Sequence, residues 1–126
     1  MAVRILIAED EESIVASLEF LMRDAGFETR VARDGGSALA QMGEFRPDLV
    51  ILDLMLPVRN GFEVCRAIRA DPQSAATRVL ILTAKGGARD PERGMAAGAD
   101  DYMTKPFSTK DLVARVRSLV TPEAAR

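Results

Sequence analysis

The chain has 126 residues, of which 48% are hydrophobic and 29% charged, and its formal net charge is −2. These values describe one globular domain with a single core, and they provide no basic field that would neutralise the phosphates of a nucleic acid. The chain contains no histidine, which excludes histidine-based catalysis and histidine metal sites, so any bound metal must have oxygen ligands.

The apolar stretches are too short to cross a membrane. The longest, at residues 49–52 and 79–82, fall far short of the roughly 20 residues that span a bilayer, and the chain does not open like a signal peptide. We therefore expect a cytoplasmic protein without membrane contact. The single cysteine, Cys65, has apolar neighbours, which favour a small buried hydrophobe over a nucleophile.

Short apolar runs rich in β-branched residues recur along the chain, and each has the length of a strand. They lie at residues 3–8, 27–32, 49–52, 79–82 and, more weakly, 101–104. The third and fourth runs are apolar throughout rather than alternating, as in strands that are buried on both faces. We therefore expect these two strands to be central.

Helical patterns separate the predicted strands. The first helix is expected to end at Gly26. A short helix is expected to start at Asp90, followed by proline, and to end at Gly98. The last helix is preceded by Ser108, with Asp111 three residues later, as in a capping box.

This order gives five βα units, which right-handed crossovers join into a parallel sheet with helices on both faces. The predicted fold class is α/β, a doubly wound, flavodoxin-like (βα)5 domain with a five-stranded sheet. The domain should fill residues 1–120, with a C-terminal tail at residues 121–126.

Polar residues follow four of the predicted strands. They are Glu9 and Asp10 after the first strand, Asp53 after the third, Thr83 after the fourth, and Thr104 and Lys105 at the end of the fifth. Ligands of open α/β sheets bind beyond the carboxyl ends of the strands, so these side chains should converge.

The three carboxylates would repel one another unless a cation lay among them, and hard oxygen ligands favour Mg²⁺. A hydroxyl and an ammonium on the other side of the crevice are suited to the oxygens of a phosphoryl group. The predicted site is therefore one for phosphate chemistry.

The sequence resembles the receiver domains of two-component response regulators (CheY-like) over about residues 4–120. The resemblance is carried by the run IAEDEE at residues 7–12, by VILDLMLP at 50–57 with NG at 60–61, by LTA at 82–84 and by GADDYMTKPF at 98–107.

The resemblance implies a role for each residue of the site. Asp53 would be the phosphoacceptor, with Mg²⁺ held by Glu9, Asp10, Asp53 and the backbone carbonyl of Met55. The phosphoryl group would come from a histidine kinase or a phosphotransfer protein. Thr83 and Lys105 would assist phosphotransfer to Asp53 and the later loss of the phosphoryl group. The domain would then be a signalling phosphoacceptor that catalyses its own phosphotransfer and dephosphorylation, and not an enzyme.

The resemblance also implies a switch. Phosphorylated Asp53 would attract the Thr83 hydroxyl, and Tyr102 would turn inward to fill the vacated space. A static packing role for Tyr102 is the alternative. The Lys105-Pro106 bond is typically cis in the family, and Gly61 is interpreted as serving the turn after the third strand.

The stretch around residues 98–117 looks most like receivers of OmpR/PhoB-type transcription factors. These dimerise through the fourth helix, fifth strand and fifth helix, and Asp100, Asp101, Asp111 and Arg115 match that face. Pro91 stands where such regulators commonly carry a basic residue, so one ion pair of that dimer is in question. A solvated charged face without dimerisation is the alternative.

Two other functional classes fit the sequence less well. A phosphorylation-independent binding module of receiver fold usually lacks one of the site residues, which are all present. A phospho-aspartyl phosphatase needs a second acid where this chain has Met55. We further hypothesise that the bulk of Met55 and Lys85 beside the site hinders attacking water and prolongs the phosphorylated state.

Overall fold

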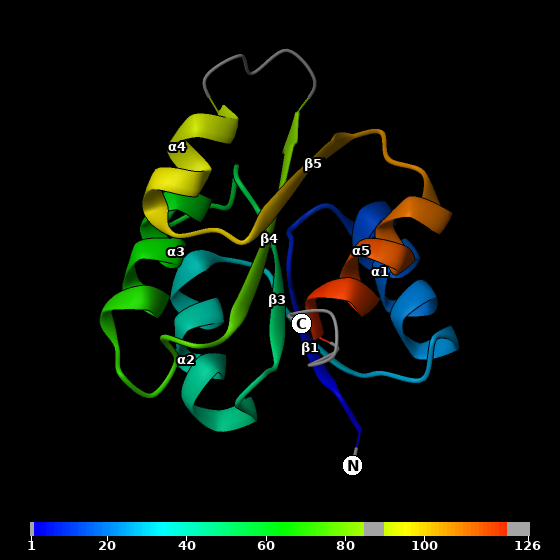
Figure 1. Cartoon of the computed structure of the whole chain (residues 1–126), viewed down its shortest axis with the longest axis horizontal. Coiled ribbons are helices and arrows are strands. Elements are labelled where there is room, and N and C mark those ends of the chain that lie inside the picture. The colour runs from blue at the N-terminus through cyan, green and yellow to red at the C-terminus, as the bar shows by residue number, and fades with distance from the viewer. Residues whose placement is uncertain (1, 85–89, 121–126) are drawn as a thin grey trace.

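The computed structural model of the chain describes residues 2–84 and 90–120. Within them, strands and helices alternate through five βα units (Figure 1). The strands are β1 (Arg4–Ala8), β2 (Glu28–Ala32), β3 (Leu49–Asp53), β4 (Arg78–Ala84) and β5 (Asp101–Lys105). The helices are α1 (Glu12–Asp24), α2 (Gly35–Phe45), α3 (Gly61–Ala70), α4 (Asp90–Ala97) and α5 (Thr109–Val120).

The five strands form one parallel sheet in the order β2-β1-β3-β4-β5. Helices α1 and α5 cover one face of it, and α2, α3 and α4 cover the other (Figure 1). The predicted doubly wound fold is confirmed, and β3 is the central strand with all five residues buried.

The sheet divides the core in two, where the sequence had predicted one. Alternate residues of β3 point to opposite faces, so Val50 and Leu52 belong to the cluster beneath α2, α3 and α4. Leu49 and Ile51 belong to the cluster beneath α1 and α5. A strand covered on both sides needs apolar residues at every position, which explains the continuous run in the sequence.

Local signals placed several helix ends correctly. Gly26 and Gly98 follow α1 and α4 with φ of +94° and +105°, conformations that glycine adopts without strain. The Asp111 N–H donates to the Ser108 hydroxyl at 3.2 Å at the start of α5. The side chain of Asp90 and the predicted tail lie outside the described residues.

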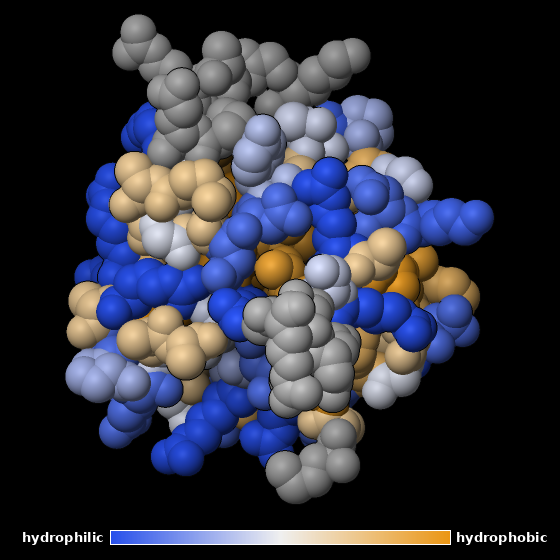
Figure 2. Space-filling model, in the orientation of Figure 1, coloured by the Kyte–Doolittle hydropathy of each residue, from blue (hydrophilic) through white to orange (hydrophobic). Residues whose placement is uncertain are grey.

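Apolar side chains on the outer surface form small separate groups among hydrophilic ones on the face shown in Figure 2. The large hydrophobic residues that are most exposed are Phe20, Met55, Val58 and Met95. In the described part of the chain, no helix is both long and apolar enough to cross a membrane.

Candidate phosphoacceptor site

Glu9 follows β1 directly and is buried, with an exposed fraction of 1%. One of its oxygens, Oε2, accepts hydrogen bonds from the backbone N–H groups of Asp10 (3.0 Å) and Glu11 (3.1 Å). These bonds orient the carboxylate, so that its other oxygen, Oε1, faces Lys105. Asp10 is the exposed member of the pair.

Asp53 is the last residue of β3 and is also buried. Its Oδ1 accepts hydrogen bonds from the Met55 backbone N–H and from the Lys105 ammonium, each at 3.2 Å. Because β1 and β3 are neighbours in the sheet, their carboxyl ends bring Glu9 and Asp53 to the same edge.

Lys105 ends β5 and reaches across the edge of the sheet to both buried carboxylates. Its ammonium lies 3.1 Å from Glu9 Oε1 and 3.2 Å from Asp53 Oδ1. The peptide bond between Lys105 and Pro106 is cis, as the resemblance implied.

The electrostatics of the site show an excess of negative charge. Burial raises the pKa of the Glu9 carboxyl above its ordinary value and the charge of Asp53 adds to this, although hydrogen bonds from the Glu11 N–H and Lys105 oppose it. Burial alone would lower the pKa of the Lys105 ammonium, but its contacts with Glu9 and Asp53 outweigh burial and raise that pKa. Lys105 therefore stays charged and only partly compensates its neighbours.

The acidic cluster fits a divalent cation. Ligand oxygens of Glu9, Asp10 and Asp53 all lie within 4.8 Å of one another. Among the residues that the structure describes, three carboxylates face one ammonium, and oxygen ligands with net negative charge are those that Mg²⁺ and Ca²⁺ prefer.

The predicted switch residues lie on neighbouring strands. Thr83 is buried near the end of β4 and lies in register with Thr104 of β5. Tyr102 lies in register with Ile81, and its half-buried side chain packs against the cluster beneath α2, α3 and α4. Their roles in switching stay predictions.

The four residues predicted for a dimer face form ion pairs within the chain. Arg115 contacts Asp101 at 3.2 Å and Asp111 at 3.4 Å. Asp100 contacts Arg69 of α3 at 2.7 Å and Arg78 of β4 at 3.4 Å. A dimer that used these residues would have to exchange or extend existing pairs.

Gly61 shows a close backbone approach that the sequence did not reveal. Gly61 does not have a positive φ. A turn conformation that favours glycine therefore does not explain why glycine stands at this position. A Cβ at Gly61 would lie 2.9 Å from the carbonyl oxygen of Asp53 and 2.8 Å from Cα of Leu54. Glycine therefore lets α3 begin directly against the backbone of the candidate phosphoacceptor.

Other structural predictions have mixed outcomes. Cys65 is buried, and burial raises the pKa of its thiol, as expected of a residue with a packing role. Met55 is 74% exposed next to Asp53, while Lys85 lies outside the described residues.

The fold is that of CheY-like domains. The profile of the family described as response regulator receiver domain matches residues 5–117, and the chain belongs to this family. It is similar to the DNA-binding response regulator MtrA of Mycolicibacterium smegmatis, at 48% identity over 118 residues, which are 94% of this chain and 50% of MtrA. MtrA is a regulator of the OmpR/PhoB type.

Two solved structures extend the comparison. A putative response regulator from Chloroflexus aurantiacus has a TM-score of 0.92 and 36% identity, with full coverage of both chains. The receiver domain of the sensor histidine kinase PA1611 from Pseudomonas aeruginosa, solved with magnesium in its active site cleft, has a TM-score of 0.87 and 28% identity, over 95% of this chain and 98% of that one. The present chain spans about half the length of the curated relatives that it matches.

Proposed function

We propose that the chain accepts a phosphoryl group on Asp53 from a histidine kinase or a phosphotransfer protein, in a Mg²⁺-dependent reaction. The observation that carries this proposal is the contact of Lys105 with both Glu9 and Asp53 at the carboxyl edge of the sheet. The negative charge of these two carboxylates and of Asp10 exceeds the positive charge of Lys105. A bound cation would therefore be stabilised at this site.

The ion would be held by Glu9, Asp10, Asp53 and the carbonyl of Met55. When bound, Mg²⁺ supplies positive charge for the phosphoryl oxygens. The receiver of PA1611 with magnesium in its cleft supports this proposal, since it shares the fold and 28% of aligned residues.

The protein's own groups position and neutralise the transferred group. An Asp53 carboxylate oxygen forms the new bond to phosphorus as the bond from phosphorus to the donor's imidazole nitrogen breaks, and that nitrogen keeps the electron pair. Lys105 lies 3.2 Å from Asp53, so its ammonium can neutralise the charge on the transferred phosphoryl oxygens.

The switch would be read on the face of α4, β5 and α5. A phosphoryl group adds about −1.5 to −2 of charge at Asp53. This charge would attract the hydroxyl of Thr83, and Tyr102, which packs beside β4, would turn inward. Binding of a second copy through this face would then convey the signal.

The output is proposed to be transcriptional. The curated relatives include DNA-binding response regulators, and the present chain matches about half of their length. The receiver itself is not proposed to touch nucleic acid, and its partners would be the phosphodonor and a copy or domain that reads its conformation.

The proposal is tested by incubating the protein with acetyl phosphate and Mg²⁺ and measuring its intact mass. The expected result is a Mg²⁺-dependent gain of one phosphoryl group that disappears in Asp53→Ala. Asp24→Ala is the matched control, since Asp24 is an exposed acid at the end of α1. No gain in the wild type would contradict the proposal and favour a binding module that works without phosphorylation.

A further inference from the structure

The loop between β3 and α3 contains a strained residue next to the candidate site. Val58 has a φ of +72°, a region that a β-branched residue rarely adopts. The Arg59 N–H donates to the Pro57 carbonyl two residues earlier, at 2.8 Å. A positive φ with such a bond indicates the strained form of the γ-turn, so other contacts must hold Val58 in place.

The turn is held by the first residue of α2. The Gly35 N–H, which has no partner within its own helix, donates to the same Pro57 carbonyl at 3.1 Å. The approach is so close that a Cβ on Gly35 would lie 2.5 Å from Cβ of Arg59 and would also clash with the Arg59 carbonyl oxygen. Only glycine fits between α2 and this turn. We call the contact of Gly35 with residues 57–59 the α2 latch.

The latch fixes the middle of a loop whose ends are already fixed. The loop leaves β3 at Leu54, whose carbonyl accepts from the Gly61 N–H at 3.0 Å. Met55 is the next residue, and its N–H donates to Asp53 Oδ1. The Met55 carbonyl therefore lies on a short segment whose two ends are held, at Leu54 by the Gly61 N–H and at Pro57 by the α2 latch.

We infer that Gly35 and Val58 are positioning residues for the metal site, and that the α2 latch sets where the Met55 carbonyl stands relative to Asp53. This inference rests on the proposed function, in which that carbonyl is a Mg²⁺ ligand. Neither residue would itself be a ligand of the metal. They act through the backbone of the loop, so the start of α2 is coupled to Mg²⁺ binding.

Gly35→Ala tests the latch, because its methyl group cannot fit without displacing residues 57–59. Mg²⁺ affinity is measured by NMR titration of the 126-residue chain with MgCl₂, following backbone amides near Asp10 and Asp53. Outer partners of metal ligands typically alter affinity by about 10- to 100-fold, and we expect the dissociation constant of Gly35→Ala to rise by about 10-fold.

Gly43→Ala is the matched control. Gly43 lies in the same helix, and a Cβ there meets nothing within 4 Å. It should leave Mg²⁺ affinity unchanged, because its methyl group displaces no neighbouring atom. A role of Gly35 in stability alone would not separate the two variants in Mg²⁺ affinity.

A pair of variants at Val58 tests the latch independently if Gly35→Ala does not fold. Val58→Gly keeps a residue that tolerates positive φ and should retain Mg²⁺ affinity within about twofold. Val58→Pro imposes a φ near −65°, which breaks the turn, and should weaken Mg²⁺ binding about as much as Gly35→Ala does.

The outcomes separate the two proposals. Weaker Mg²⁺ binding in Gly35→Ala and Val58→Pro, with wild-type affinity in Gly43→Ala, supports the latch. Wild-type affinity in a folded Val58→Pro or Gly35→Ala overturns the latch and leaves the proposed function standing. A wild-type protein that binds no Mg²⁺ overturns both.

Discussion

The two edges of the sheet hold their charged groups in different ways. At the amino edge, the Asp100 carboxylate accepts hydrogen bonds from Arg69 (2.7 Å), Arg78 (3.4 Å) and the Val79 N–H (2.8 Å). At the carboxyl edge, Glu9 and Asp53 share the ammonium of Lys105. Among the described residues, two guanidinium groups thus face one carboxylate at the amino edge, whereas one ammonium faces two buried carboxylates at the carboxyl edge.

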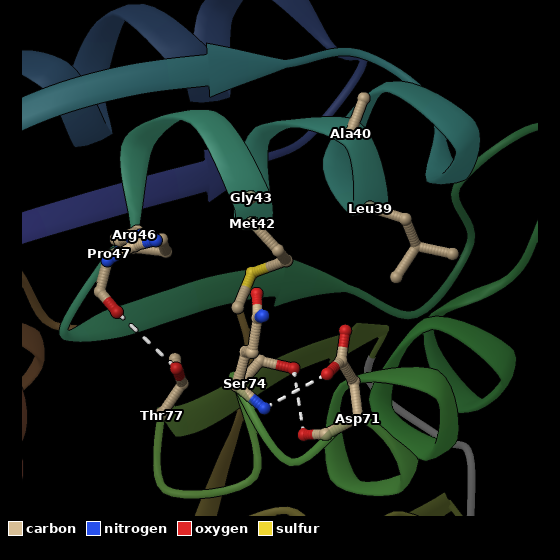
Figure 3. A pocket seen from close by; sticks show the side chains of 10 residues that line it. Leu39, Ala40, Met42, Gly43, Arg46, Pro47, Asp71, Ser74 and Thr77 are labelled. Carbon is tan, nitrogen blue, oxygen red and sulfur yellow. Dashed lines mark hydrogen bonds between the residues drawn. The ribbon is translucent and has the colours of Figure 1, made fainter.

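A pocket at the amino edge shows the same contrast. It has a volume of about 610 Å³ and lies between the end of α2 and the segment that joins α3 to β4 (Figure 3). Its two hydroxyl groups bond within the chain, since the Ser74 hydroxyl donates to the Ile68 carbonyl at 2.7 Å and the Thr77 hydroxyl donates to the Pro47 carbonyl at 3.4 Å. The volume of a pocket is therefore a poor guide to the functional site. Groups that can act on a ligand are those whose charge is not fully neutralised by other groups of the chain.

Arg69 gives the amino edge its structure. Its guanidinium also donates to the backbone carbonyls of Gly98 (2.8 Å), Ala75 (3.1 Å) and Thr77. It thereby joins α3 to the turn before β5 and to the segment before β4. We therefore expect the contacts of the amino edge to stabilise the fold and those of the carboxyl edge to serve the chemistry. One variant at each edge tests this expectation.

The largest expected effect is that of Lys105→Ala on phosphotransfer. Removing a charge that faces the transferred group typically slows such reactions about 10²- to 10³-fold, and we expect a loss of this size in the rate of phosphorylation by acetyl phosphate. Lys110→Ala, which removes an exposed lysine of α5, is the control and should react at the wild-type rate. A Lys105→Ala protein that reacts as fast as the wild type would show that the carboxyl edge does not depend on this charge.

The next effect is that of Arg69→Met on stability. The substitution removes the shorter of two guanidinium contacts to Asp100 and the guanidinium donor to three backbone carbonyls. Loss of a partner from such a network costs about 3 kcal/mol in free energy of unfolding. The phosphorylation rate of the folded variant should stay that of the wild type. Arg66→Met, on the exposed side of the same helix, should change the free energy of unfolding by less than about 0.5 kcal/mol.

Urea unfolding followed by circular dichroism checks these values. If Arg69→Met were as stable as the wild type, the hydrogen bonds at the amino edge would not be what stabilises this end of the fold. If it lost phosphotransfer while remaining folded, the two edges would be coupled.

The sequence predicted the carboxyl edge better than the amino edge. Glu9, Asp53 and Lys105 each stand at the end of an apolar run, and in a parallel sheet the carboxyl ends of neighbouring strands meet. A local pattern and one topological rule were therefore enough to bring them together. Arg69 and Gly98 are 29 positions apart in the sequence, and no local pattern connects them.

Two glycines that contact the loop after β3 show the same limit. The sequence indicates glycine where a turn needs a positive φ, and this reasoning worked for Gly26 and Gly98. Gly35 and Gly61 are needed because another segment comes close, to Arg59 and to Asp53 respectively. Such approaches depend on how distant loops pack, so they become visible only once the fold is known.

A smaller effect is expected from Met55→Asn on dephosphorylation. Met55 is 74% exposed beside Asp53, and its bulk would hinder water that attacks the phosphoryl group. A smaller polar side chain should speed dephosphorylation about 3- to 10-fold, which corresponds to at most ~1.4 kcal/mol of activation free energy. Met55→Leu keeps the bulk and should keep the wild-type rate, as followed by the decay of phosphorylated protein in intact mass spectra. An unchanged rate in Met55→Asn would count against the hypothesis.

The smallest effect that we expect is a pH dependence of stability that comes from Glu9 at the carboxyl edge. It is measured in the absence of metal, as the difference in free energy of unfolding between the wild type and Glu9→Gln. Burial and Asp53 raise the pKa of Glu9 in the folded state above its ordinary value of 4.5, so the folded protein holds this proton at a higher pH than the unfolded chain does. The contribution of Glu9 to stability is therefore fully present below pH 4.5 and is lost as the pH rises through the folded pKa. The wild type should lose stability relative to Glu9→Gln as the pH rises above 4.5. Glu44→Gln, at an exposed position of α2, serves as the control for removing one negative charge. A difference that is flat or rises with pH would mean that Lys105 compensates Glu9 fully, and the excess of negative charge that distinguishes this edge from the other would not exist.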